Sequence, residues 1–167
     1  VRDKDAVSAC AILAEIAAWA KDQGITMYQL LQNIYVQYGF SKEKGISVVK
    51  KGKSGAEEIE AMMKNFRENP LQEIAGSKVT LFYDYASLKG YSYIDNEALA
   101  LDMPTTSNVL QYFTEDNTKV SIRPSGTEPK IKFYCEVHSK VNSLEDLPAA
   151  DKAGEEKINQ IKASLGI

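Results

Sequence analysis

The sequence has 167 residues, of which 44% are apolar and 26% are charged. Its formal net charge is −3 and its pI is near 5.3. A chain of this size buries roughly 70% of its surface on folding, and its composition excludes a disordered or fibrous protein. The acidic balance argues against a general nucleic-acid binder, which needs uncompensated cations to neutralise phosphates.

Targeting and redox signals are weak. The sequence has no run of 18 apolar residues and no signal-peptide order at its start, which predicts a cytoplasmic protein without a membrane partner. Cys10 and Cys135 lack a CxxC spacing, so a disulfide or zinc site is not expected and each is predicted to be a small buried apolar residue. The single histidine, His138, is predicted to be structural or exposed.

The first 40 residues predict two helices. The first runs from about Ala6 to Lys21 and is apolar on almost every side; Asp3 or Asp5 can cap it, and Gly24 follows its end. Such a helix is typical of one that packs against a sheet. The second is predicted over Met27–Tyr38.

Local signals mark both ends of this second helix. Thr26 and Gln29 have the spacing of a capping box, and Gly39 follows the last helical residue. The two helices are interpreted as the end of an α/β domain.

A lysine-rich stretch comes next. Its cations are Lys42, Lys44, Lys50, Lys51 and Lys53, with Glu43 among them. The stretch is interpreted as a solvated linker, and a domain hinge is expected within residues 38–53. A Walker A loop is excluded because Ser47 occupies the position where that motif needs its first glycine.

Residues 45–167 predict a separate α+β unit. Helices are expected from Ser54, with Glu57 completing a capping box, to about Arg67, and from about Ala149 to Leu165. Strands are expected at Ile46–Val49, Val79–Tyr85, Asn108–Thr114, Lys119–Arg123 and Lys130–His138. This order predicts an antiparallel sheet with helices on one face.

The segment Arg123-Pro-Ser-Gly-Thr-Glu-Pro129 lies between two of these strands. An arginine can offer paired donors to a phosphate, and the hydroxyls of Ser125 and Thr127 add two more. Gly126 would let backbone N–H groups turn inward as an anion nest. The chemistry fits an anion site, although such a cluster between strands is more often only a turn.

Residues 120–134, Val-Ser-Ile-Arg-Pro-Ser-Gly-Thr-Glu-Pro-Lys-Ile-Lys-Phe-Tyr, closely resemble the phosphate-binding signature of the α-D-phosphohexomutases, the phosphoglucomutases and phosphomannomutases. Residues 103–113 resemble the strand before that loop, and residues 2–7 resemble the end of the family's third domain. The resemblance implies a C-terminal part of such an enzyme. Residues 1–40 would end the third domain, 41–53 would be hinge and first strand, and 54–167 would form a phosphate-binding domain similar to the TATA-box-binding protein.

The resemblance assigns substrate-phosphate binding to Arg123, Ser125, Gly126, Thr127 and Lys132. Lys132 stands where many members of the family carry an arginine, and strand alternation places it, with Lys130 and Tyr134, away from the helices. Glu128 is expected to orient Arg123 or to fix the loop, because a carboxylate repels a phosphate.

The family's phosphoserine, magnesium-binding acidic loop and sugar-selecting loop have no match in this sequence. No catalytic residue and no metal ligand are therefore assigned here, and Mg²⁺ is expected only in the longer parent enzyme. The family interconverts hexose 1- and 6-phosphates through a bisphosphate intermediate. The chain alone is expected to bind phosphosugar weakly, to be inactive and to self-associate through its first helix.

Three alternatives remain. A phosphopentomutase of the same family would differ only in its sugar. A non-catalytic anion-binding module would use the same loop. A nucleic-acid-binding protein is suggested only by the analogy of fold, which is a weak argument for function. The identity of the sugar is not encoded in these residues.

Overall fold

The structure, a computed structural model, describes residues 4–50 and 52–167. Its contacts form two compact units. One contains the residues up to 40 together with 139–150, and the other contains residues 41–138 with 151–167. The predicted division into residues 1–40, 41–53 and 54–167 remains a prediction.

In the first unit, helix α1 (Ala6–Asp22) begins where an aspartate caps it: the Ser8 amide donates to Asp5 Oδ1 at 3.0 Å. Asp3, the other predicted cap, lies outside the described residues. The chain leaves the helix through Gly24, whose φ of +73° lies in the left-handed region that glycine adopts without strain.

Helix α2 (Met27–Tyr38) has the predicted ends. The Gln29 amide donates to Thr26 Oγ1 at 3.1 Å, and the Thr26 amide donates to Gln29 Oε1 at 2.8 Å. Gly39 closes the helix with a φ of +98°. The capping box therefore forms as predicted.

A small apolar cluster closes this unit. Phe40, Val141 and Leu147 are buried together, and the ring of Tyr35 meets that of Phe40 at a centroid distance of 4.9 Å. In α1, by contrast, only Ala20 is buried. Cys10 is exposed, so the prediction that it is buried is wrong.

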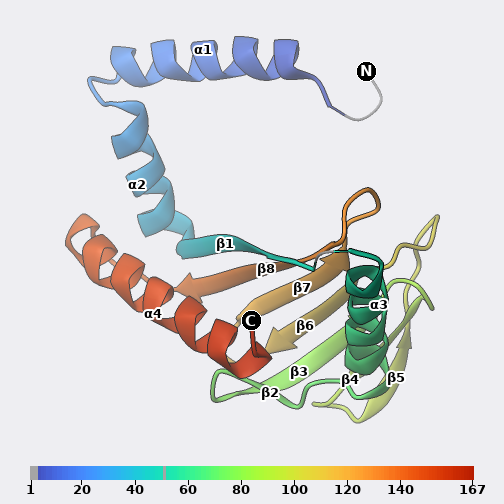
Figure 1. Cartoon of the computed structure of the whole chain (residues 1–167). Coiled ribbons are helices and arrows are strands. Elements are labelled where there is room, and N and C mark those ends of the chain that lie inside the picture. The colour runs from blue at the N-terminus through green and yellow to red at the C-terminus, as the bar shows by residue number, and fades with distance from the viewer. Residues whose placement is uncertain (1–3, 51) are drawn as a thin grey trace. The chain divides into compact units, whose positions relative to one another are not determined.

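The second unit is built on an eight-stranded sheet in the order β1-β8-β7-β6-β3-β4-β5, with β2 paired to β3 (Figure 1). The described ladders from β8 to β5 are antiparallel. The strands are β1 (Phe40–Val49), β2 (Glu73–Ile74), β3 (Ser77–Asp84), β4 (Lys89–Ser92), β5 (Glu97–Ala100), β6 (Leu110–Thr114), β7 (Lys119–Pro124) and β8 (Lys130–Ser139). Two helices, α3 (Gly52–Glu68) and α4 (Leu147–Leu165), accompany it; a 3₁₀ turn, η1 (Leu144–Asp146), precedes α4.

The structure corrects three sequence predictions. Strand β1 begins at Phe40 and not at Ile46, α3 begins at Gly52 so that Ser54 lies inside it instead of capping it, and β2, β4 and β5 were not predicted. Residues 40–49 are thus a strand and not a solvated linker. A hinge within residues 38–53 remains a prediction.

The lysines of β1 are paired with α4. Lys42 Nζ lies 2.6 Å from Asp151 Oδ1, and Lys44 forms an ion pair with Glu155. Lys50 Nζ lies 3.1 Å from Glu58 Oε2 of α3. Lys51 is outside the described residues. Three of the five lysines therefore contact acidic side chains of α3 and α4.

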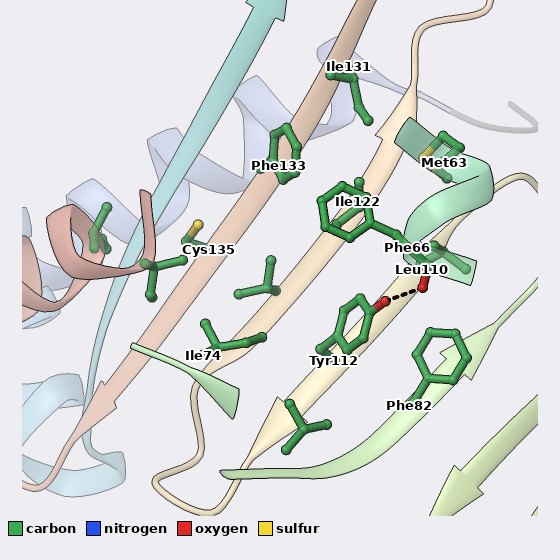
Figure 2. Close-up of a cluster of buried hydrophobic side chains, with 14 of the residues drawn as sticks. Met63, Phe66, Ile74, Phe82, Leu110, Tyr112, Ile122, Ile131, Phe133 and Cys135 are labelled. Atoms are coloured by element: carbon green, nitrogen blue, oxygen red, sulfur yellow. Dashed lines mark hydrogen bonds between the residues drawn. The ribbon is translucent and has the colours of Figure 1, made fainter. Parts of the chain in front are cut away.

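The core lies between the sheet and these helices (Figure 2). Met63 and Phe66 of α3 meet the buried strand residues, and the Tyr112 hydroxyl donates to the Phe66 carbonyl at 2.7 Å. Ile158 and Ile161 of α4 are fully buried. Because the helical and strand side chains share one core on one face of the sheet, the predicted α+β class with an antiparallel sheet is confirmed.

Within residues 4–50 and 52–167, no helix is long and apolar enough to cross a membrane.

Candidate phosphate-binding site

Two cations face each other at the end of β7 and β8. Arg123 and Lys132 are Cα partners in the antiparallel ladder, so their side chains leave the same face of the sheet. The neighbouring partners Ile122 and Phe133 are fully buried under the helices. Alternation along each strand therefore places Arg123 and Lys132 on the face of the sheet opposite to α3 and α4.

The same two strands carry a compensated pair at their other end. Lys119 and Glu136 are also Cα partners, and their side chains form an ion pair. His138, the only histidine, places Nε2 2.8 Å from Glu136 Oε1. Opposite charges thus meet at one end of the ladder, whereas like charges meet at the end next to the loop.

The loop between the strands is closed by backbone bonds. The Ser125 amide donates to the Lys130 carbonyl at 2.8 Å, and the Lys130 amide donates to the Glu128 carbonyl at 2.7 Å. The Lys50 amide, at the end of β1, donates to the Pro129 carbonyl at 2.9 Å. These bonds fix both ends of the loop, which projects beyond the sheet between β7 and β8 (Figure 1). Residues 126 and 127, between the bonded positions, are exposed.

Four side chains around the loop keep their donors available. Within the described part of the chain, the Arg123 guanidinium, the Lys132 ammonium and the Ser125 and Thr127 hydroxyls have no hydrogen-bond or ion-pair partner. Guanidinium, ammonium and hydroxyl groups are the donors that bind phosphate oxygens. The arrangement can accept an anion without first breaking an internal bond.

Unlike these four side chains, Lys130 and Glu128 have partners. They form an ion pair with each other, and the hydrogen bond from Lys130 holds the pKa of Glu128 below its usual value. Glu128 forms no hydrogen bond or ion pair with Arg123 in the described residues, so of the two predicted roles, orienting Arg123 and fixing the loop, its contacts with Lys130 favour the second. Glu128 forms its ion pair with Lys130, whereas Lys132 attracts it only weakly and keeps an ammonium group without a hydrogen-bond partner among the described residues.

Gly126 has room around it. A Cβ added there would meet no atom within 4 Å, and its φ is not among the positive values of the described glycines. Within the described residues, no atom and no backbone angle therefore requires glycine at this position. The anion nest predicted from its flexibility stays a prediction, and the open space beside its backbone leaves room for a ligand to approach closely.

A groove lies on the helical side of the loop. It has a volume of about 490 Å³ and is lined by Ser125, Glu128 and Lys130 and by the face of α3 that carries Met63 and Arg67. Arg123, Gly126, Thr127 and Lys132 do not line it. The structure thus places the two cations together on the open sheet face, whereas Ser125 lies where the loop borders the groove. The α3 side of this groove had no sequence motif that could have revealed it.

The described residues contain no group of three or more His, Cys, Asp or Glu side chains that could hold a metal ion.

Comparison with known proteins shows the protein family to which the chain belongs. Residues 46–153 match the phosphoglucomutase/phosphomannomutase C-terminal domain. The chain belongs to the phosphoglucomutase/phosphomannomutase family.

Individual relatives agree with that assignment. A phosphoglucomutase of Staphylococcus haemolyticus is 35% identical over 138 residues, which are 83% of this chain and 25% of that protein. One from Staphylococcus aureus is 35% identical over 152 residues, covering 86% of this chain and 27% of the relative. This chain thus spans about a quarter of the length of these relatives.

Among solved structures, the open form of the Paramecium phosphoglucomutase pp63/parafusin aligns with 98% of this chain and 28% of its own. The TM-score is 0.47 and the sequence identity is 17%.

Proposed function

We propose that this chain is the C-terminal substrate-phosphate-binding part of an enzyme that interconverts sugar 1- and 6-phosphates through a bisphosphate intermediate. Glucose and mannose phosphates are the favoured substrates, with a pentose phosphate as the alternative. In this proposal Arg123, Ser125, Gly126, Thr127 and Lys132 hold the phosphate that does not react. The phosphoryl carrier and the Mg²⁺ ion would belong to other parts of the whole enzyme.

One observation carries the proposal: Arg123 and Lys132 stand directly opposite each other, and within the described residues neither side chain forms a hydrogen bond or an ion pair. Like charges in directly opposite positions of a ladder destabilise a sheet. The arrangement becomes favourable when a dianionic phosphate lies between the two cations, because both then gain charge-assisted hydrogen bonds. Lys119 and Glu136, which are opposite each other on the same two strands, form an ion pair instead. The same ladder thus contains one pair of opposite charges and one pair of like charges.

The chemistry explains why a remote phosphate site serves such an enzyme. The bisphosphate must turn around between two phosphoryl transfers, and a site that grips either phosphate positions the other one in line with its acceptor. Binding energy far from the reacting atoms is thereby used to orient the group that reacts.

The direct test is an NMR titration of the 167-residue chain with glucose 6-phosphate. We expect weak, saturable shifts of the Ser125, Gly126 and Thr127 amides, which disappear in Arg123→Gln. Lys119→Gln, a lysine change on the same strand, is the matched control and should leave the shifts unchanged. Shifts confined to residues 42–53 in the starting protein would contradict the assignment.

In the whole enzyme, Arg123→Ala should lower kcat/KM by about 30- to 1000-fold, because a charge-assisted and partly bidentate contact is worth on the order of 2–4 kcal/mol. Assays against a panel of hexose and pentose 1-phosphates would identify the sugar. A parent protein that binds these compounds and turns none of them over would favour the non-catalytic module.

A further inference from the structure

A second pocket lies away from the phosphate loop, beyond the end of α3. Its volume is about 810 Å³, within the range of pockets that hold small molecules. Arg67, Pro70 and Gln72 form one wall, and Phe82, Tyr91 and Tyr93 supply aromatic surface from β3 and the β4 region. None of the five residues assigned to phosphate binding lines it.

The two tyrosine rings are held in place. Tyr91 and Tyr93 are packed edge to face with a centroid distance of 4.9 Å. Gln72 Nε2 donates to the Tyr93 hydroxyl at 3.2 Å, and the Tyr91 hydroxyl donates to Asn96 Oδ1. Because the amides are engaged in holding the rings, the pocket offers few free amide groups for the many hydroxyls of a neutral sugar. It offers rigid aromatic surface instead, which suits a flat ring.

The charges of the pocket favour an anion. The Asp84 carboxylate, whose side chain is only 6% exposed, accepts hydrogen bonds from Arg67 Nε at 3.1 Å and from Ser87 Oγ at 2.7 Å. Its negative charge is therefore compensated inside the protein. Lys89 also lines the pocket and has no ion pair elsewhere in residues 4–50 and 52–167. Two cations, Arg67 and Lys89, thus stand against one carboxylate, Asp84.

We propose that this pocket binds a planar heterocycle that carries a negative charge, the class to which nucleoside monophosphates belong. The ring would stack in the aromatic part, where stacking on a fixed aromatic side chain contributes to affinity for any flat base. Lys89, which lines the pocket from β4, would contact the anionic group. The proposal is independent of the phosphate loop.

The test uses AMP as the probe, with adenosine and ribose 5-phosphate as its two halves. In an NMR titration of the 167-residue chain, AMP should shift the amides of Gly90, Tyr91 and Tyr93. Adenosine should shift the same amides with lower affinity. Ribose 5-phosphate should act only at residues 125–127, which separates this pocket from the phosphate loop.

Variants distinguish stacking from charge. Tyr91→Leu should raise the Kd for AMP on the order of ten-fold, whereas Tyr91→Phe, which keeps the ring, should preserve it. Lys89→Gln, an exposed change that leaves the core intact, should weaken AMP binding several-fold without affecting adenosine. Arg123→Gln should have no effect at this pocket.

AMP-dependent shifts confined to residues 125–127 would overturn the proposal. So would equal AMP affinity in the starting protein, Tyr91→Leu and Lys89→Gln.

Discussion

Replacing Lys132 by glutamine should make the ligand-free protein more stable and the phosphate-bound protein less stable. Without ligand, the change removes the repulsion between Arg123 and Lys132, which are opposite each other in the ladder. Directly opposed like charges affect stability by about 0.2–1 kcal/mol. Arg123 is exposed, so solvent screening places the expected gain in the lower half of that range.

Adding phosphate should make the Lys132→Gln variant less stable than the starting protein. At a concentration of 100 times Kd, a ligand that binds only the folded state adds about 2.7 kcal/mol to the free energy of unfolding. If losing one charge-assisted contact weakens binding about ten-fold, the same concentration adds only about 1.4 kcal/mol to the variant. The difference of about 1.3 kcal/mol exceeds the gain from relieved repulsion. Plotted against phosphate concentration, the free energies of unfolding of the variant and of the starting protein should therefore cross.

Urea unfolding, with and without phosphate at constant ionic strength, measures both effects. Lys119→Gln is the matched control, because it removes the partner of Glu136 and should lower stability slightly and equally in both conditions. A Lys132→Gln protein that is less stable without phosphate, or that gains as much from phosphate as the starting protein, would refute the argument.

Four further results are expected. Gly126→Ala should leave the free energy of unfolding unchanged, since an added Cβ meets nothing within 4 Å, yet should weaken phosphate binding measured by calorimetry; unchanged binding would show that no ligand approaches this backbone. Tyr112→Phe should cost about 1–3 kcal/mol in urea unfolding, because it leaves the buried Phe66 carbonyl without its donor; a neutral result would mean that water replaces the hydroxyl. Burial tends to raise the pKa of Asp116, but hydrogen bonds from Thr114, Lys157 and Thr118 outweigh it and hold the net pKa well below its usual value. The free energy of unfolding should therefore decline as pH falls below about 4. Asp116→Asn should flatten that decline in unfolding curves recorded across pH. Leu13 is 55% exposed on α1, and Leu13→Glu should reduce self-association of the chain in light scattering, whereas a starting protein that is monomeric at high concentration would contradict that expectation.

The sequence predicted best the features that depend on neighbouring residues. The capping box of Thr26 and Gln29 is a contact across three positions, and it set the start of α2 correctly. The hairpin of β6 and β7 joins strands separated by a short turn, and both were predicted close to their observed bounds. The cations Arg123 and Lys132 were assigned from a contiguous motif.

Features that depend on distant residues were missed. Lys42 and Lys44 looked solvated because their partners, Asp151 and Glu155, lie in the last helix. The short strands β4 and β5 pair around positive-φ residues such as Asn96 and include alanines, which are poor strand formers. For the same reason the aromatic pocket beside Tyr91 could not be predicted, since its walls come from α3, β3 and β4 together.

The pairing of β1 with α4 also bears on the order in which the chain can fold. Lys42 and its partner Asp151 are 109 positions apart, and Lys44 and Glu155 are 111 apart. A ribosome releases β1 long before α4, so during synthesis these lysines have no acidic partners and the buried residues of α4 are missing from the core. Contacts of such wide separation slow folding. The edge of the sheet at β1 should therefore become protected from hydrogen exchange only after the last helix has been released, and late in refolding from urea.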